Sequence, residues 1–357
     1  IEYDLLGRQS KSYLPLAVTD SYGAYKTNAL TEIQSFYNTE KYEYTSNPYS
    51  ENLFDGSPLN LVMEQAAPGD AWKEGNTVEH TIRNEYKLVE TNDNVRNYRV
   101  TYDINGTPSL LDNGYFGIGE VNIQNAFNTP TIYKFITKNE NWVITDANDN
   151  TTQTFKDYRG RTLLIRTFES QIAHDTYYVY DSYGNLSYVL PPESEASSLK
   201  PDSTELSELC YQYKYDDKNR LIEKKIPGRG WEYIVYNTLD QPVLTQDTNL
   251  KNQGKWLFTK YDVFGRVAYT GLISNSSSRS VLQTTVDAIN STYVTKSSSS
   301  TTISGTTIYY NNAAFPVLGS GDEIHSINYY DNYTFNKVSG NLESAYAVVP
   351  ITDVKGL

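Results

Sequence analysis

Short stretches of alternating hydrophobic and polar residues, separated by turn-forming residues, run through most of the chain. The segments "VYDSYGNLSYVL" (179–190) and "KYDVFGRVAYTG" (260–271) have the same form. Each has an aromatic residue and Asp, two variable positions, Gly, a polar residue and then β-forming residues. Alternation with a period of two is typical of strands with one buried face, and Asp and Gly favour the turn between them. The pattern therefore predicts an antiparallel β-hairpin at each copy.

An Asp followed three residues later by Gly occurs repeatedly. The copies are Asp4–Gly7, Asp103–Gly106, Asp157–Gly160, Asp181–Gly184 and Asp262–Gly265, with the variants Asp216–Asn219 and Asn237–Asp240. Gly, Asn and Asp are the residues that best tolerate a left-handed backbone, so the variants preserve the turn. We therefore predict a structural role for these turn residues and for their aromatic neighbours, Tyr3, Tyr180, Tyr215, Tyr236 and Tyr261.

The spacing of the copies predicts a repeat architecture. Between Asp157 and Asp262 the copies begin 24, 35, 21 and 25 residues apart, which suits one hairpin per repeat. One hairpin is too small to bury a core alone, so neighbouring hairpins must stack. The sequence predicts an all-β fold made of an antiparallel hairpin repeat sheet.

Four regions follow from these patterns. We expect a less regular β region at 1–150, the repeat array at 151–273, a serine-rich exposed insertion of ribbon or loop character at 274–307, and a further β segment at 308–357 that continues beyond the chain end. Residues 28–38 ("NALTEIQSFYN") and the end of the acidic stretch 191–209 ("DSTELSEL") have the spacing and caps of short helices. Because the sequence begins without Met, we expect it to be a piece of a larger protein.

Composition excludes several classes of function. The net charge of −13 disfavours nucleic acid or an anionic membrane as partner, because phosphates repel such a surface. The single cysteine, Cys210, excludes an intramolecular disulfide and a cysteine-cluster metal site, and is most simply a small buried apolar group. No apolar run is long enough to span a bilayer.

Candidate catalytic and metal-binding residues have simpler structural explanations. His80, His174 and His325 are far apart and lack metal-ligand spacing. The repeat aspartates recur at one motif position, as turn residues do, whereas a catalytic residue is usually unique. The glycines at 114, 117 and 119 lack the spacing of a phosphate-binding loop and indicate a bulged strand or tight turn. We predict no catalytic, cofactor-binding or metal-binding residue, and therefore no enzyme.

Arginine recurs directly after the left-handed position of several turns, at Arg8, Arg161, Arg220 and Arg266. These side chains could bind an anionic glycan or peptide. We favour a ladder in which each guanidinium pairs with a carboxylate or covers a tyrosine ring on a neighbouring strand. Cross-strand aromatic pairs would then hold a wide sheet without a thick core.

The segments "YDLLGRQ", "YDSYGNL", "YKYDDKNRL" and "KYDVFGRV" resemble the tyrosine-aspartate repeats of the Rhs family. The runs 209–247 and 255–272 resemble the Bacteroidota version, and 47–72 resembles the region preceding its main array. The resemblance implies a sheet that spirals into a hollow shell, often enclosing a toxic carboxy-terminal domain, exported by the type IX system and anchored at the cell surface. The family's Asp-Pro autocleavage region and a toxin domain are not found in this sequence.

We therefore expect a structural role, outside the cell or on its outer surface, in which the chain encases or displays another part of the same polypeptide. Type IX secretion or surface-anchoring machinery would be a further partner. A carbohydrate-binding or adhesive module is the alternative, and it requires exposed Tyr or Trp clusters in a groove. A glycoside hydrolase is a second alternative, and it requires two carboxylates converging in a deep pocket.

Overall fold

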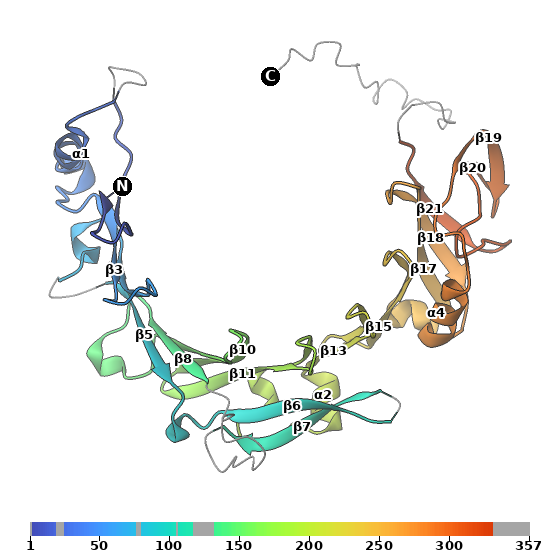
Figure 1. Cartoon of the computed structure of the whole chain (residues 1–357), viewed down its shortest axis with the longest axis horizontal. Coiled ribbons are helices and arrows are strands. Elements are labelled where there is room, and N and C mark those ends of the chain that lie inside the picture. Colours follow the sequence, from blue (N-terminus) through green and yellow to red (C-terminus); the bar gives the residue numbers. More distant parts are fainter. Residues whose placement is uncertain (1, 19–24, 76–79, 105, 117–131, 331–357) are drawn as a thin grey trace. The chain divides into compact units, whose positions relative to one another are not determined.

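The computed structural model describes residues 2–18, 25–75, 80–104, 106–116 and 132–330, and these residues are mostly β-strand with few helices (Figure 1). The strands that pair in the sheets do so in antiparallel fashion, which confirms the predicted all-β class. Every helix among the described residues is too short or too polar to cross a membrane. The chain divides into two compact units, residues 1–214 with 225–228, and residues 215–224 with 229–357. The predicted boundaries at 150, 273 and 307 stay predictions.

In the first unit the strands follow one another as a meander, in which almost every strand pairs with the next along the chain. The strands are β1 (Glu2–Tyr3), β2 (Gln9–Tyr13), β3 (Tyr49–Phe54), β4 (Val62–Ala66), β5 (Ile82–Leu88), β8 (Tyr133–Lys138), β9 (Thr151–Lys156), β10 (Thr162–Glu169), β11 (Ile172–Tyr180), β12 (Leu186–Leu190) and β13 (Tyr211–Tyr215). On β9 and β11 buried and half-buried residues alternate, as expected for strands with one face in the core.

The core of the first unit lies where a separate hairpin packs against this sheet. The hairpin consists of β6 (Arg96–Tyr102) and β7 (Pro108–Tyr115), and it lies beside β11 in Figure 1. The Tyr98 ring meets the Tyr177 ring edge to face, 5.4 Å between centroids. Phe155, Leu164 and Leu190 are fully buried in the same cluster.

Both predicted helices are present in the first unit. Helix α1 (Ala29–Tyr37) buries Ile33, and α2 (Ser203–Glu208) begins after Asp202. The Asp202 carboxylate accepts the amides of Thr204 and Glu205, while Glu205 accepts the amide of Asp202. This reciprocal cap explains why so short a helix forms. Single turns of 3₁₀-helix occur at Glu40–Tyr42, Asp70–Trp72, Thr91–Asp93, Ile144–Asp146 and Pro192–Ser194.

The second unit is built on a sheet of the same kind. Its strands are β14 (Leu221–Lys225), β15 (Trp231–Tyr236), β16 (Pro242–Gln246), β17 (Lys255–Tyr261), β18 (Val267–Ser274) and β21 (Glu323–Ile327). From β15 to β18 each strand pairs with the next, and β18 also pairs with β21. The short helix α3 (Thr248–Asn252) connects β16 to β17, and Asp247 caps it by accepting the amide of Leu250.

The serine-rich stretch 274–307 contains a helix that its composition did not predict. Helix α4 (Arg279–Asp287) lies beside β15 in Figure 1 and buries Leu282 and Val286. The hairpin of β19 (Lys296–Ile303) and β20 (Thr306–Tyr310) follows it. The expected ribbon is therefore present, with a packed helix before it. Together with fully buried Trp256 and Phe258, these segments form the core of the second unit.

Candidate functional site

The repeat turns all close through the same two backbone hydrogen bonds. We number each turn from its Asp or Asn (position 1). The amide of position 4 donates to the carbonyl of position 1, and the amide of position 1 donates to the carbonyl of position 5, at 2.8–3.1 Å. Strand register slips just before several of these turns, as in a hairpin loop that ends in a bulge. In the described residues this geometry is found in the turns that begin at Asp4, Asp103, Asp157, Asp181, Asp216, Asn237 and Asp262.

The side chain at position 1 accepts two backbone amides of its own turn. In the turn at Asp262, Oδ1 accepts the amides of Phe264 and Arg266, both at 2.9 Å. The Asn237 side chain makes the equivalent two bonds at 3.0 Å each. Asp262 is itself only 8% exposed. Because buried polar groups need hydrogen-bond partners, the aspartate and the turn amides satisfy one another.

Position 4 has a left-handed backbone in every one of these turns. Its φ ranges from +59° at Asn219 to +95° at Gly184, and Asp240 has φ of +60°. Gly, Asn and Asp enter this conformation at the lowest cost, which is why they alternate at this position. The other glycines that the sequence places here, Gly7, Gly106, Gly160 and Gly265, also have positive φ.

Position 5 carries a side chain that bonds back to position 1. Four turns use arginine, whose Nε donates to the carboxylate in the pairs Arg8–Asp4, Arg161–Asp157, Arg220–Asp216 and Arg266–Asp262, at 2.6–2.8 Å. In the turn at Asp181, Asn185 Nδ2 donates instead, at 3.0 Å. In the turn at Asn237 the direction is reversed, since Asn237 Nδ2 donates to Gln241 Oε1 at 2.8 Å. Each turn arginine thus has a carboxylate partner in its own turn.

The same arginines also cover an aromatic ring, which for Arg8, Arg161 and Arg220 is the residue that precedes the next turn. Arg8 lies over Phe54 at 4.6 Å, Arg161 over Tyr180 at 4.8 Å, Arg220 over Tyr236 at 4.7 Å and Arg266 over Tyr330 at 4.2 Å from the ring centroid. A guanidinium within about 6 Å of a ring centroid makes a favourable cation–π contact. Arg8, Arg161 and Arg220 therefore each join two successive turns.

Several of the repeat tyrosines also donate a hydrogen bond from their hydroxyl group to the backbone beside the preceding turn. Tyr236, Tyr261 and Tyr330 donate to the carbonyls of Leu221, Pro242 and Val267, at 2.9–3.0 Å. Each acceptor directly follows position 5 of the preceding turn. Tyr330 therefore occupies the place of a repeat tyrosine, which the sequence analysis did not assign. Of the predicted tyrosines, Tyr3 differs because it is 61% exposed.

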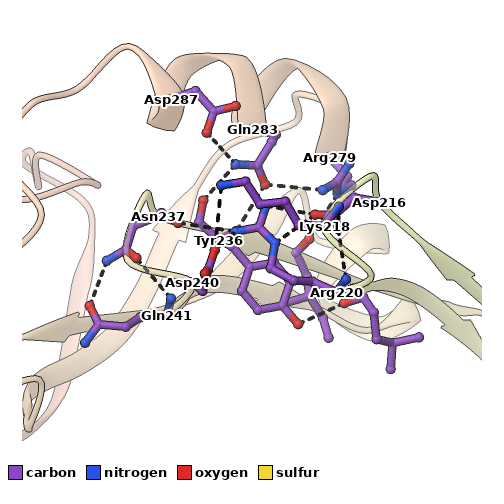
Figure 2. A network of polar contacts seen from close by, with 12 residues as sticks. Asp216, Lys218, Arg220, Tyr236, Asn237, Asp240, Gln241, Arg279, Gln283 and Asp287 are labelled. Atoms are coloured by element: carbon purple, nitrogen blue, oxygen red, sulfur yellow. Dashed lines mark hydrogen bonds and ion pairs between the residues drawn. The ribbon is translucent and has the colours of Figure 1, made fainter. Parts of the chain in front are cut away.

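Figure 2 shows this contact between turns at Arg220 and Tyr236. Besides Asp216, Arg220 Nη1 donates to Asp240 Oδ1 at 2.6 Å in the following turn. Lys218 approaches the same carboxylate at 3.8 Å. Position 4 of one turn can therefore pair with position 5 of the turn before it, a contact that Gly at position 4 cannot make.

One turn with these contacts escaped the sequence pattern because its loop is longer. Asp55 donates its amide to the Leu61 carbonyl and accepts the Leu61 amide on Oδ1, and Asn60 supplies the left-handed residue with φ of +56°. Arg8 covers Phe54, and its Nη1 donates to the Asp55 carbonyl at 2.9 Å. A sequence pattern that requires an aromatic residue followed by Asp, and allows any distance to the next Asn or Gly, would identify this turn.

The serine-rich region also binds the repeat tyrosines, through their backbone. Gln283 on α4 accepts the Tyr236 amide on Oε1 at 3.1 Å and donates Nε2 to the Tyr236 carbonyl at 2.7 Å (Figure 2). Arg279 Nε donates to the Ile234 carbonyl at 3.0 Å. Farther along, the Val294 amide donates to the Tyr261 carbonyl at 2.8 Å. Residues 279–294 are thus fixed to two successive repeats.

Two of the turn aspartates have shifted pKa values. The backbone hydrogen bond from Arg8 lowers the pKa of the Asp4 carboxyl, with further help from the Arg8 guanidinium. For Asp216, partial burial acts to raise the pKa, but the amide and guanidinium of Arg220 outweigh it, and the pKa is lowered. Both carboxylates are therefore held in the charged form that the turn requires.

The residues considered for catalysis or metal binding lie apart from one another. His80 lies beside Trp72, while His174 and His325 approach Glu169 and Glu323 at 4.0 and 3.5 Å. Over the described ranges, no three His, Cys, Asp or Glu side chains are grouped so that they could hold a metal ion. Cys210 is buried, and burial raises the pKa of its thiol to about 11. Gly114, the penultimate residue of β7, has φ of +85°, whereas residues 117 and 119 lie outside the described residues.

The sequence and structure were compared with known proteins. A family model described as a domain of unknown function (DUF6443) matches residues 1–88. No curated protein matches the chain. The structure is weakly similar to the crystal structure of TcdB2-TccC3-Cdc42, with a TM-score of 0.32 and 12% identity over 64% of this chain and 11% of that chain. It is also weakly similar to the Photorhabdus luminescens Tc holotoxin pore carrying a TccC3 mutation, with a TM-score of 0.30 and 12% identity over 70% of this chain and 14% of that chain.

Proposed function

We propose that this chain is a structural shell or scaffold segment of a large bacterial protein of the Rhs type. The observation that carries the proposal is a recurring contact between successive turns, in which the arginine of one turn covers the aromatic residue of the next. The aspartate, arginine and tyrosine of a repeat are all engaged within the sheet. Such residues extend and stabilise an array, so we assign them no catalytic role.

This contact suits a shell because it stabilises a wide sheet without a thick core. Repeat proteins gain stability from intrinsic repeat terms and from interfaces between neighbours. Here the interface consists of a cation–π contact, a tyrosine hydrogen bond or both, and contacts of these kinds recur along the array. An array of this kind can grow by adding hairpins while each hairpin keeps the same local contacts.

A more specific proposal concerns what the repeat array encloses and where the protein is located. We propose that it encases or displays another region of the same polypeptide, such as a carboxy-terminal toxin or effector. We further propose that the protein is of the Bacteroidota type and that the type IX system exports it to the outer cell surface. The support for these statements is the resemblance of the repeat segments, including "YDLLGRQ" and "KYDVFGRV", to Rhs repeats.

Limited proteolysis of the natural full-length polypeptide tests the shell role. We expect the region outside the array to resist protease while the array is intact, and to be cleaved in the double variant Asp181→Ala/Gly184→Val. Gly56→Val is the matched control, because Gly56 has an ordinary φ and open space around its Cβ position. Equal cleavage in the wild-type and double-variant proteins would contradict encapsulation.

A glycan array distinguishes the adhesive alternative. Tyr183 and Phe264 sit at turn tips and are 77% and 76% exposed. If the chain bound glycans and lost binding in Tyr183→Ala or Phe264→Ala, adhesion would replace the shell as the favoured function.

A further inference from the structure

The second unit buries a lysine in its hydrophobic core. Lys260 on β17 is 1% exposed, two positions before the turn residue Asp262. The same position is occupied by fully or almost fully buried valines before two other turns, Val179 and Val235. A lysine in an apolar position must lose the hydration of its ammonium group, so its surroundings call for an explanation.

The surroundings of the Lys260 amine are dominated by one carboxamide. Its Nζ lies 2.7 Å from Asn312 Oδ1, and 5.2 Å from the centroid of the Tyr269 ring. The charged group that acts on it is the Asp322 carboxylate, which raises its pKa, while burial lowers the pKa more strongly, to about 7. Above that pH the amine is largely uncharged and carries a free electron pair, which is the nucleophilic form of lysine.

The Asn312 carboxamide is held in a fixed orientation by the backbone of Leu318. Its Oδ1 accepts the Leu318 amide at 3.0 Å, and its Nδ2 donates to the Leu318 carbonyl at 2.9 Å. The Leu318 N–H therefore already points at the oxygen on which negative charge would develop if the carbonyl carbon were attacked. This is the arrangement by which backbone amides stabilise tetrahedral intermediates.

We propose that Lys260 and Asn312 form an intramolecular isopeptide bond without an external enzyme. The electron pair of Lys260 Nζ attacks Cγ of Asn312, and the carbonyl electrons move to Oδ1, which the Leu318 amide stabilises. One proton passes from Nζ to Nδ2, the Cγ–Nδ2 bond breaks, and ammonia leaves as the amide forms. The balance is one amine plus one carboxamide giving one secondary amide plus ammonia, so no oxidant or other co-reactant is required.

The structure offers an exit for the ammonia. Asn312 and Leu318 line a surface depression together with residues 301–305 and 319–321. Asp322, whose Oδ2 accepts the Gly319 amide at 2.8 Å, fixes the loop at this place. Lys260 is thus buried, whereas Asn312 is half-buried and borders an opening.

The bond would connect the repeat sheet to the segment after the β19–β20 hairpin, closing a loop between residues 52 apart in sequence. Because a cross-link removes conformations from the unfolded chain, it would resist unfolding of that loop. This inference does not depend on the shell function, because it concerns chemistry inside one unit.

Intact-mass measurement of the purified chain tests the bond directly. After incubation at a pH of about 8, above the pKa of Lys260, we expect a mass lower than the sequence mass by one ammonia. Digestion should yield one branched peptide that joins the segments around Lys260 and Asn312. In Asn312→Asp the same branched peptide would form with loss of water instead of ammonia.

Variants locate the reaction. We expect Lys260→Met and Asn312→Ala to keep the full sequence mass, and Lys255→Met, on the same strand but paired with Glu323 at the surface, to react like wild type. An unchanged wild-type mass after prolonged incubation would overturn the proposal, and this result does not depend on whether any variant folds. Loss of ammonia that persists in Lys260→Met would overturn it equally, because it would arise elsewhere.

Discussion

The guanidinium of Arg220 lies over the ring of Tyr236, 4.7 Å from its centroid, although the two residues belong to successive turns. The same arginine pairs with Asp216 in its own turn at 2.8 Å and with Asp240 in the next at 2.6 Å. One side chain therefore stabilises its own hairpin and also the contact between that hairpin and the next. A substitution of Arg220 should weaken both.

We expect Arg220→Gln to destabilise the second unit by about 2 kcal/mol, since charge-assisted hydrogen bonds and a cation–π contact are lost together. Urea unfolding followed by tyrosine and tryptophan fluorescence measures this change. In a double-mutant cycle with Tyr236→Leu, the two substitutions should be non-additive because they remove a shared contact.

Lys218→Gln is the control. The Lys218 side chain is 55% exposed and its nitrogen lies as far as 3.8 Å from the Asp240 carboxylate, so its loss should change the free energy of unfolding little. Additive effects of Arg220→Gln and Tyr236→Leu would show that the turns are not coupled through this pair.

Asp181→Ala tests the inner hydrogen bonds of a turn. The carboxylate accepts the amides of Tyr183 and Asn185 at 2.9 and 2.8 Å and is 5% exposed. Its removal leaves two amides without their partner, so we expect a loss of about 2 kcal/mol in the free energy of unfolding. Asp181→Asn should restore most of it, because Asn237 performs the same task in its own turn. Equal stability of the alanine variant and wild type would contradict the assigned role.

Gly184→Val tests the left-handed position. With φ of +95° at Gly184, a β-branched residue is strained, at a cost of about 1–3 kcal/mol. The added Cβ would lie 3.6 Å from Arg161 Nη1, an ordinary contact distance, so the cost comes from the backbone conformation. Thermal unfolding should show a lower midpoint for Gly184→Val than for the control Gly56→Val, whose site has ordinary φ and open space. Similar unfolding midpoints for the two variants would contradict the requirement for a left-handed backbone at position 184.

Acid should weaken the turn at Asp216 and leave an amide version of it unaffected. The folded-state pKa of Asp216 is lowered from 3.8, so its stabilisation is complete above that value and is lost as the pH falls through the lower folded pKa. In Asp216→Asn this part of the pH dependence should disappear. Unfolding free energies measured from about pH 5 to about pH 2 give the comparison. A variant with the same pH profile as wild type would show that Asp216 does not titrate in this window.

Gln283→Ala should release helix α4 from the sheet. The Tyr236 amide loses its acceptor, and the Tyr236 carbonyl loses its donor. We expect hydrogen exchange at the Tyr236 amide to accelerate roughly tenfold for a loss of about 1.4 kcal/mol. Thr284→Ala, an exposed neighbour that bonds only within the helix, should leave exchange at Tyr236 unchanged. Unchanged exchange in Gln283→Ala would mean that Arg279, Leu282 and Val286 hold the helix without Gln283.

The sequence was sufficient to predict the all-β class, because alternation and turn residues are local signals. Asp181 and Gly184 could be assigned to a turn since each residue type follows from the backbone it must adopt. The partner at position 5 follows only in part from the sequence. The pattern shows the recurring arginines, but it favours carboxylates on neighbouring strands and gives no sign of the pairs Asn185–Asp181 and Gln241–Asn237. Side-chain reach across a turn is not visible in residue spacing alone.

Helix α4 was missed for a different physical reason. Its sequence, "RSVLQTTVD", contains several residues of modest helix propensity, so composition favoured a loop. Tertiary contacts decide the outcome, because Leu282 and Val286 pack into the core and Gln283 binds the Tyr236 backbone. The spacing of four residues between Leu282 and Val286 was the available sign, since it places both on one helical face.

The turn at Asp55 has a consequence for how the array can change. Arg8 covers Phe54 and bonds the Asp55 carbonyl although that loop is longer than its neighbours. Recognition between hairpins therefore depends on the residues flanking a loop and not on the loop's length. A foreign peptide could then be grafted between the first and last residues of such a turn without disturbing the hairpins on either side, which makes the loops, and not the strands, the natural places for variation.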